Sequence, residues 1–150
     1  GQRFNDVSRS SGPYFQRAVV GRSSAVADYD RDGRLDLAIG HLNSELVLLR
    51  NVSQQVEMTS LRIELVGVRC NRDAIGAVVE VLSQKRRLTR FRTAATGYLS
   101  CDEASLTIGI GETETAVNVL VRWPGEKNEI FRSLQPGRRH VLIEGNGTPE

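Results

Sequence analysis

An acidic stretch, DYDRDGRLD at residues 28–36, contains the residue types and spacing best suited to chemistry. Carboxylates occupy its positions 1, 3, 5 and 9, which are Asp28, Asp30, Asp32 and Asp36. Four like charges in one short loop repel one another unless a cation lies among them. The spacing therefore predicts a bound cation, and the alternative is an Asp- and Gly-rich hairpin turn that needs no metal.

Calcium is the cation that this loop fits best. Calcium takes roughly 6–8 oxygen ligands, whereas magnesium keeps several of its waters. The aspartates would supply side-chain oxygens, Arg34 at position 7 would supply its backbone carbonyl, and Gly33 would allow the sharp turn. An EF-hand would need a glutamate at position 12, where this chain has Ile39. The flanking segments also alternate as strands, so the sequence predicts a strand–loop–strand calcium site.

The elements that must position this loop are strands, and the whole chain is expected to be all-β. No segment shows a sustained helical period with caps. The predicted strands alternate apolar and polar residues or form short apolar runs. They cover residues 24–28, 35–40, 45–51, 61–68, 75–82, 88–95, 105–111, 116–123, 129–134 and 139–145.

The strands fall into two groups separated by a polar stretch, NVSQQVEMTS. Residues 1–55 hold three or so short strands, too few to bury a sheet alone, and end in a linker. Residues 56–145 hold about seven regularly spaced strands, which is typical of a β-sandwich-like domain. Residues 146–150 are expected to be a frayed tail.

The bulk composition is that of a folded globular protein. Of the 150 residues, 39% are hydrophobic and 25% are charged, which argues against a disordered chain. The formal net charge of +2 is too balanced to indicate nucleic-acid binding. No apolar run approaches the roughly 18 residues that a membrane helix needs, so no membrane insertion is expected. The first residues look like a cut made inside a longer protein.

The sequence gives little indication of catalysis. The two histidines, His41 and His140, lie in different strand groups and outside any nucleophile motif. Asp102 and Glu103 are adjacent on the chain, so on a strand they would point to opposite faces and would not work as a pair. We therefore expect no enzyme. The two cysteines, Cys70 and Cys101, are either free thiols or one disulfide, and the sequence leaves both alternatives open.

Residues 24–41, SAVADYDRDGRLDLAIGH, closely resemble an FG-GAP/VCBS repeat, the blade unit of integrin-like β-propellers. In that family the D-x-D-x-D-G-x-x-D loop binds calcium between blade strands. The resemblance implies that Asp28, Asp30, Asp32, Asp36 and the Arg34 carbonyl hold calcium in a structural role. One repeat is present and a propeller needs typically 4–8 blades, so the resemblance also implies a partial propeller blade in residues 1–55 and missing N-terminal blades as partners.

The second group of strands resembles the ASPIC/UnbV domain, which follows FG-GAP repeats in the cartilage acidic protein-like family and in many bacterial surface or secreted proteins. The matching motifs span about residues 61–125. They are LVGVRCNRDAIGA, GYLS, LTIGIG and VRWPG. LTIGIG has isoleucines where the family often shows H-F-G-L-G, and Cys70 and Cys101 stand beside two of the motifs. If those motifs lie side by side, a bridge between the cysteines becomes plausible.

The resemblance implies a non-catalytic, extracellular or cell-surface module in the C-terminal part of a larger propeller protein. An extracellular glycan or a matrix or cell-surface protein is the partner it suggests. The candidate contact surface is the NRD loop with the GYLS turn: Asn71, Arg72, Asp73, Tyr98 and Ser100. For the NRD loop, the favoured alternative is that Asp73 and Arg72 lock the loop by hydrogen bonds and serve only the fold. Two other functions stay open: a propeller cap with no ligand, and a carbohydrate-active enzyme.

Overall fold

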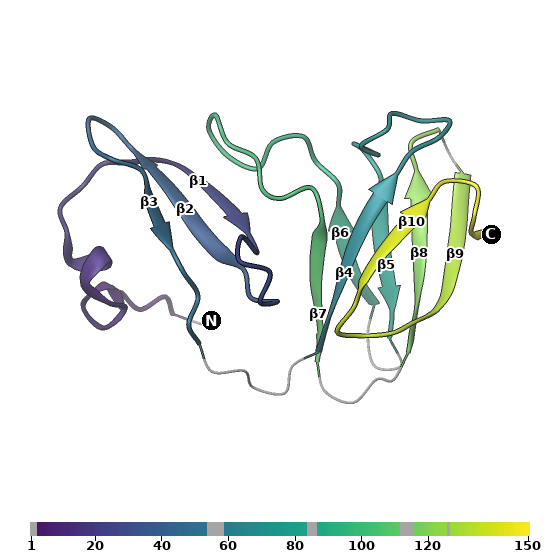
Figure 1. The fold of residues 1–150 in the computed structure, drawn as a ribbon, viewed down its shortest axis with the longest axis horizontal. Helices are drawn as coiled ribbons and strands as arrows, with labels where there is room; N and C mark the ends of the chain where they lie inside the picture. Colours follow the sequence, from purple (N-terminus) through teal and green to yellow (C-terminus); the bar gives the residue numbers. More distant parts are fainter. Residues whose placement is uncertain (1–2, 54–58, 84–86, 112–115, 126) are drawn as a thin grey trace.

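The computed structural model describes residues 3–53, 59–83, 87–111, 116–125 and 127–150. It is an all-β chain with three sheets and two short 3₁₀ helices (Figure 1), which confirms the predicted fold class. The elements are η1 (Ser8–Ser10), η2 (Pro13–Gln16), β1 (Gly21–Ala27), β2 (Asp36–His41), β3 (Val47–Leu49), β4 (Thr59–Val66), β5 (Val78–Leu82), β6 (Arg87–Phe91), β7 (Leu106–Gly111), β8 (Val117–Trp123), β9 (Lys127–Leu134), β10 (Arg139–Ile143) and β11 (Thr148–Pro149).

The N-terminal sheet is an antiparallel meander in the order β1-β2-β3. Its strands form where the sequence predicts them, on either side of the acidic loop. In the described part of residues 3–53, no hydrophobic side chain reaches the burial of the core. This sheet therefore has no core of its own. The predicted boundary at residue 55 lies outside the described residues.

The C-terminal part is a sandwich of a three-stranded and a five-stranded sheet, in the orders β10-β4-β7 and β11-β9-β8-β5-β6. Buried apolar residues recur at every second position along β4, β5, β7 and β8, so one face of each sheet is buried. The core lies between the two sheets and consists of Leu61, Ile63, Leu65, Ala74, Ala77, Val79, Val81, Ile108, Ile110, Val117, Val119, Val121, Trp123 and Leu142. The sandwich thus supplies the hydrophobic stabilisation of the described chain.

Two features of the sandwich were not predicted from the sequence. The last residues do not fray: β11 pairs with β9, Thr148 opposite Ile130, and the Glu150 N–H donates to the Asn128 carbonyl at 3.1 Å. The sandwich also closes with β10 parallel to β4. The other pairings are antiparallel.

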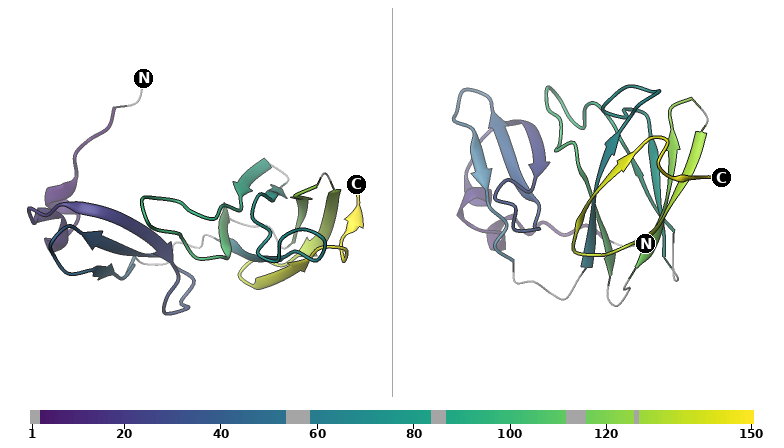
Figure 2. Two further views of the ribbon diagram at one scale, coloured as in Figure 1. Left: turned by 90° about the horizontal axis from the view of Figure 1, so that it is seen from above. Right: turned by 45° about the vertical axis from the view of Figure 1, so that its right-hand side comes forward.

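The N-terminal sheet lies beside the open side of the sandwich, where β6 and β7 end their respective sheets (Figure 1). The long connection between β6 and β7 reaches across to β1, and the C-terminus lies at the opposite end of the molecule (Figure 2). No helix in the described ranges is long and apolar enough to cross a bilayer.

Candidate functional site

The acidic loop joins β1 to β2 and brings three of its four carboxylates together. One oxygen each of Asp28, Asp30 and Asp36 lie within 4.8 Å of one another. Asp28 ends the outgoing strand and Asp36 begins the returning one. The turn between them depends on two left-handed residues, Arg31 at φ 62° and Gly33 at φ 87°. The predicted spacing therefore produces a cluster of carboxylate oxygens at the mouth of a hairpin.

Backbone N–H groups hold these carboxylates in place. The Asp36 carboxylate accepts from the Tyr29 N–H at 3.2 Å and from the Asn51 N–H at 2.8 Å, and so joins the loop to the chain beyond β3. Asp28 Oδ2 accepts from the Gly33 N–H at 3.1 Å, which closes the turn. These bonds fix the orientation of the Asp28 and Asp36 carboxylates.

Asp28 has one oxygen that these bonds do not use. Its side chain is only 3% exposed, and Oδ1 is buried without a hydrogen-bond partner. A buried, unpaired carboxylate oxygen is costly, on the order of 1–3 kcal/mol or more. A cation held jointly with Asp30 and Asp36 would satisfy this atom.

Asp32, the fourth predicted ligand, lies outside the cluster. Its carboxylate pairs with the Arg34 guanidinium and lies 3.5 Å from Nη2 of Arg50. The backbone N–H of Arg34, at 2.9 Å, holds the pKa of Asp32 below its usual value, with further help from both arginines. Arg50 also contacts Asp30, with Nε 2.6 Å from Oδ2. Arg34, predicted to contribute its carbonyl, uses its side chain to bind Asp32 and the Asn51 carbonyl.

The sandwich reaches the same cluster through Arg62 of β4. Its Nη1 lies 2.7 Å from Asp28 Oδ2, and its Nη2 pairs with Glu103. The Nε of Arg62 donates to Ser105 Oγ at 3.0 Å, and the Asp28 N–H donates to Glu103 Oε2 at 3.0 Å. Burial opposes ionisation of Glu103, but the bonds from Asp28, Ser105 and Arg62 lower its pKa overall. The acidic loop is therefore attached to the sandwich by the Arg62–Asp28 ion pair and by the hydrogen bond from the Asp28 N–H to Glu103.

The chain around Asp102 and Glu103 also covers the outer edge of β1. The Val26 N–H donates to Asp102 Oδ1 at 2.8 Å, and the Glu103 N–H donates to the Val26 carbonyl at 2.9 Å. An uncovered edge strand would be free to pair with another chain. Sequence reasoning considered these two carboxylates only as a catalytic pair and missed this role. Their position two and three residues after the GYLS motif was the available signal.

The predicted contact surface is divided between two loops. Asn71, Arg72 and Asp73 lie in the β4–β5 connection. There the Asn71 side chain accepts from the Ile75 N–H at 2.7 Å and donates to the Ile75 carbonyl at 2.9 Å. These bonds fix the loop through Asn71, whereas the favoured alternative named Arg72 and Asp73.

The GYLS turn is in the β6–β7 connection, apart from the NRD loop (Figure 1). The structure does not join the two loops into one surface. Tyr98 faces the N-terminal sheet: its hydroxyl lies 3.3 Å from Nη2 of Arg22, whose guanidinium carbon is 4.7 Å from the ring centroid. Ser100 bridges to Gly97 across the turn, and its hydroxyl is buried without a partner. Leu99 at the tip is 88% exposed at φ 50°.

Both cysteines are free thiols, so the disulfide alternative is not the one in this structure. Cys101 is exposed in the β6–β7 connection. Cys70 lies in the β4–β5 connection, where burial, together with Glu144, raises the pKa of its thiol.

Glu144 accepts from the backbone N–H groups of Cys70, Val68 and Arg69 at 3.0, 2.9 and 2.7 Å. Despite burial, these bonds lower the pKa of Glu144 to about 2, so this carboxylate anchors the loop.

Fold and site together define a class of protein: an all-β module in which a hairpin with an acidic loop is attached to a two-sheet sandwich. The family model described as ASPIC and UnbV matches residues 67–149, which is more than half of the chain. The chain belongs to the ASPIC and UnbV family. Comparison with curated proteins returned no match. The family match begins just after β4, although β4 is a central strand of the three-stranded sheet.

Proposed function

We propose that this chain is a non-catalytic extracellular module that binds calcium structurally in its acidic loop and belongs to the C-terminal part of a larger propeller protein. The observation that carries the calcium proposal is the buried, unpartnered Oδ1 of Asp28, which belongs to a cluster with carboxylate oxygens of Asp30 and Asp36. The membership of the chain in the ASPIC and UnbV family supports the extracellular location.

The residues present fit calcium by their chemistry. The cluster offers oxygen ligands only, which is the set that calcium prefers. Asp28, Asp30 and Asp36 would hold the ion, and Asp32 and the Arg34 carbonyl are the further ligands that the spacing suggests. Bound calcium would supply positive charge at the point where three carboxylates meet. The loop would then fasten β1 to β2 without relying on arginines alone.

The propeller proposal is supported by the absence of a core under the N-terminal sheet. In the described part of residues 3–53, Val26, Leu37, Ile39, Val47 and Leu49 are at best half-buried. A sheet with one covered edge and no apolar core needs additional packing, which neighbouring blades would provide. The missing partners would therefore be further FG-GAP-type blades.

A second candidate function is a propeller cap with no ligand of its own. It is favoured by one observation, the coverage of the β1 edge by Asp102 and Glu103.

The same bonds bear on the enzyme alternative, because both carboxylates already accept from backbone N–H groups of the N-terminal sheet. This arrangement supports a structural role for the pair. A hydrolysis screen on glycans with Asp102→Asn and Glu103→Gln tests it, and activity that either change abolishes would favour the enzyme.

The calcium proposal is tested by thermal unfolding of the chain with calcium, with magnesium and with a chelator. Calcium at about 100 times its dissociation constant should add about 2.7 kcal/mol of stability. For a chain of this size, that raises the melting temperature by about 5–10 °C. Asp28→Asn should abolish the shift, whereas Asp6→Asn, which removes an exposed carboxylate outside the loop, should leave it intact. A shift that persists in Asp28→Asn would overturn the proposal.

A further inference from the structure

Three arginine side chains form ion pairs with aspartates of the acidic loop. They come from three parts of the chain, and they are Arg34 in the loop itself, Arg50 directly after β3 and Arg62 of β4. A cation that enters the cluster is repelled by all three, so the arginine that the rest of the protein holds least should give way first. Their exposure and their other partners distinguish them.

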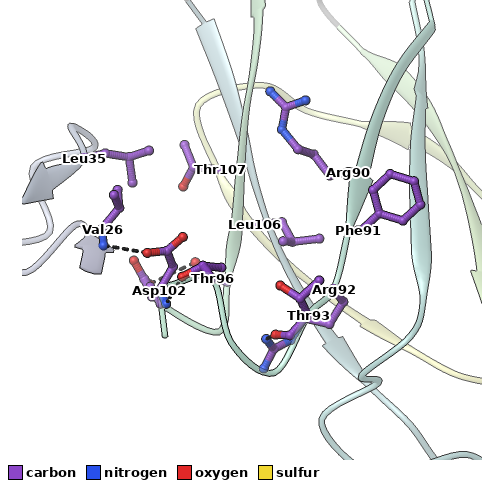
Figure 3. A pocket seen from close by; sticks show the side chains of 12 residues that line it. Val26, Leu35, Arg90, Phe91, Arg92, Thr93, Thr96, Asp102, Leu106 and Thr107 are labelled. Atoms are coloured by element: carbon purple, nitrogen blue, oxygen red, sulfur yellow. Dashed lines mark hydrogen bonds between the residues drawn. The ribbon is translucent and has the colours of Figure 1, made fainter. Parts of the chain in front are cut away.

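Arg62 is held firmly. Its side chain is 24% exposed, and besides Asp28 it pairs with Glu103 of the β6–β7 connection. The strand that leads into Asp28 is fixed on the same side, because the Val26 N–H donates to Asp102 Oδ1 at 2.8 Å (Figure 3). Displacing Arg62 would therefore break the attachment of the acidic loop to the sandwich.

Arg34 is held by the loop and by the chain beyond β3. Its side chain is 25% exposed and pairs with Asp32. Its Nε donates to the Asn51 carbonyl at 2.8 Å, and its backbone N–H donates to Asp32 Oδ1 at 2.9 Å. The turn itself would have to open before Arg34 could leave.

Arg50 differs from both. Its side chain is 53% exposed, its Nε lies 2.6 Å from Asp30 Oδ2, and its Nη2 lies 3.5 Å from Asp32 Oδ2. In the part of the chain that the structure describes, its ion pairs are with these two aspartates. Exposed ion pairs of this kind contribute little to stability, so this arginine can leave without disturbing the fold.

Arg50 takes up a carboxylate that the proposed calcium ion needs. Asp30 belongs to the cluster with Asp28 and Asp36. Arg50 satisfies the cluster only in part, because Asp28 Oδ1 stays buried without a hydrogen-bond partner. One calcium ion bound to Asp30 and to Asp28 Oδ1 would neutralise both carboxylates at once, which gives it an advantage over the arginine.

We propose that Arg50 is an exchangeable counter-ion of the calcium site. It pairs with Asp30 and Asp32 when calcium is absent, and it leaves them when calcium binds. Its departure also removes one of the two arginines that hold Asp32, the fourth aspartate of the predicted ligand set. The inference rests on the proposed calcium function, and it names the residue that sets the calcium affinity.

The first test is calorimetric titration of the whole chain with calcium. Arg50→Gln should bind calcium at least fivefold more tightly than wild type, as expected if the pair with Asp30 is formed about 80% of the time and blocks the site while it lasts. Arg31→Gln is the matched control, because it removes an equal charge from an exposed position inside the loop. Arg31 forms no ion pair in the described residues, and its charge is screened by salt, so the affinity should change less than twofold.

The second test follows the Arg50 Nε–H in NMR spectra of the wild-type chain. Its exchange with water should be slow while it donates to Asp30 and should become faster when calcium is added. The Nε–H of Arg34, which is bonded to the Asn51 carbonyl, should keep its exchange rate and serves as the internal control. This measurement needs no variant.

The results separate the two proposals. If wild type binds calcium but Arg50→Gln binds it no more tightly, the role of Arg50 is refuted while the calcium site stands. Equal tightening by Arg31→Gln, or an Arg50 Nε–H whose exchange calcium does not change, leads to the same conclusion. If neither wild type nor Arg50→Gln binds calcium, both the calcium function and the role of Arg50 are refuted.

Discussion

Asp28 would be stabilised by two positive charges, the Arg62 guanidinium and the proposed calcium ion. Replacing Arg62 by methionine should show how much each of them contributes. Arg62 contacts Asp28 Oδ2 at 2.7 Å, pairs with Glu103 and bonds to Ser105. Breaking a buried ion pair by removing one partner costs about 3–5 kcal/mol, because the remaining charge is left uncompensated. The Arg62 side chain is 24% exposed, so solvent reduces this cost to about 2–3 kcal/mol.

The assay is urea unfolding of wild type and Arg62→Met, with and without calcium. Without calcium the variant should lose about 2–3 kcal/mol of unfolding free energy. With calcium it should recover part of this loss, because calcium would neutralise the carboxylate that Arg62 leaves behind. The calcium-dependent gain in stability should therefore be larger in the variant than in wild type.

Arg139→Met is the matched control. Arg139 lies opposite Arg62 in the β10–β4 register but pairs with Glu64 at the surface, where its own side chain is 61% exposed. Such a pair contributes about 0–1 kcal/mol. If Arg62→Met is no more destabilising than Arg139→Met, the ion pairs of Arg62 with Asp28 and Glu103 contribute no more to the free energy of unfolding than a surface pair does. That result would refute the reasoning.

Three other outcomes follow from the β4–β5 connection and the cysteines. Glu144→Gln should lose about 2–3 kcal/mol at neutral pH. The pKa of Glu144 in the folded chain is lowered from 4.5 to about 2, so its contribution to the unfolding free energy is full above pH 4.5 and is lost toward pH 2. The unfolding free energies of wild type and variant, measured in urea, should therefore converge between pH 4.5 and pH 2. A difference that stays constant over this interval would contradict the assignment. Gly67→Ala should lose about 1–3 kcal/mol, because its Cβ would lie 2.1 Å from the Asn71 carbonyl oxygen; an unchanged melting temperature would be inconsistent with this loop. Mass spectrometry after alkylation should find Cys101 labelled in the folded chain and Cys70 more slowly, and a chain that resists labelling until it is reduced would show a disulfide.

Local patterns in the sequence were sufficient to predict the strands. Leu61, Ile63 and Leu65 alternate with polar residues in β4, and all three are buried in the core. Gly125, in the VRWPG motif, has a φ of 97°, a conformation that favours glycine. The pairing of β10 with β4 was not predictable, because these strands are far apart in the sequence and no turn fixes their register. β11 was missed because two residues in a Gly-rich tail carry no strand pattern.

The acidic loop shows a similar division between local and long-range information. The alternating aspartates correctly indicated that Asp28, Asp30 and Asp36 converge, because strand and turn geometry determines their positions. The separation of Asp32 from the cluster depends on Arg50 of the neighbouring strand end as well as on Arg34. The attachment through Arg62 and Glu103 depends on tertiary contacts. Spacing along the chain contains no information about either.

A crystal structure of the chain grown in millimolar calcium, with anomalous diffraction data, tests the central claim most directly. We expect one calcium ion bound to carboxylate oxygens of Asp28, Asp30 and Asp36 at about 2.3–2.6 Å, with Asp28 Oδ1 among its ligands. An ordered acidic loop with no anomalous peak, and with Asp28 Oδ1 still unpartnered, would contradict the account.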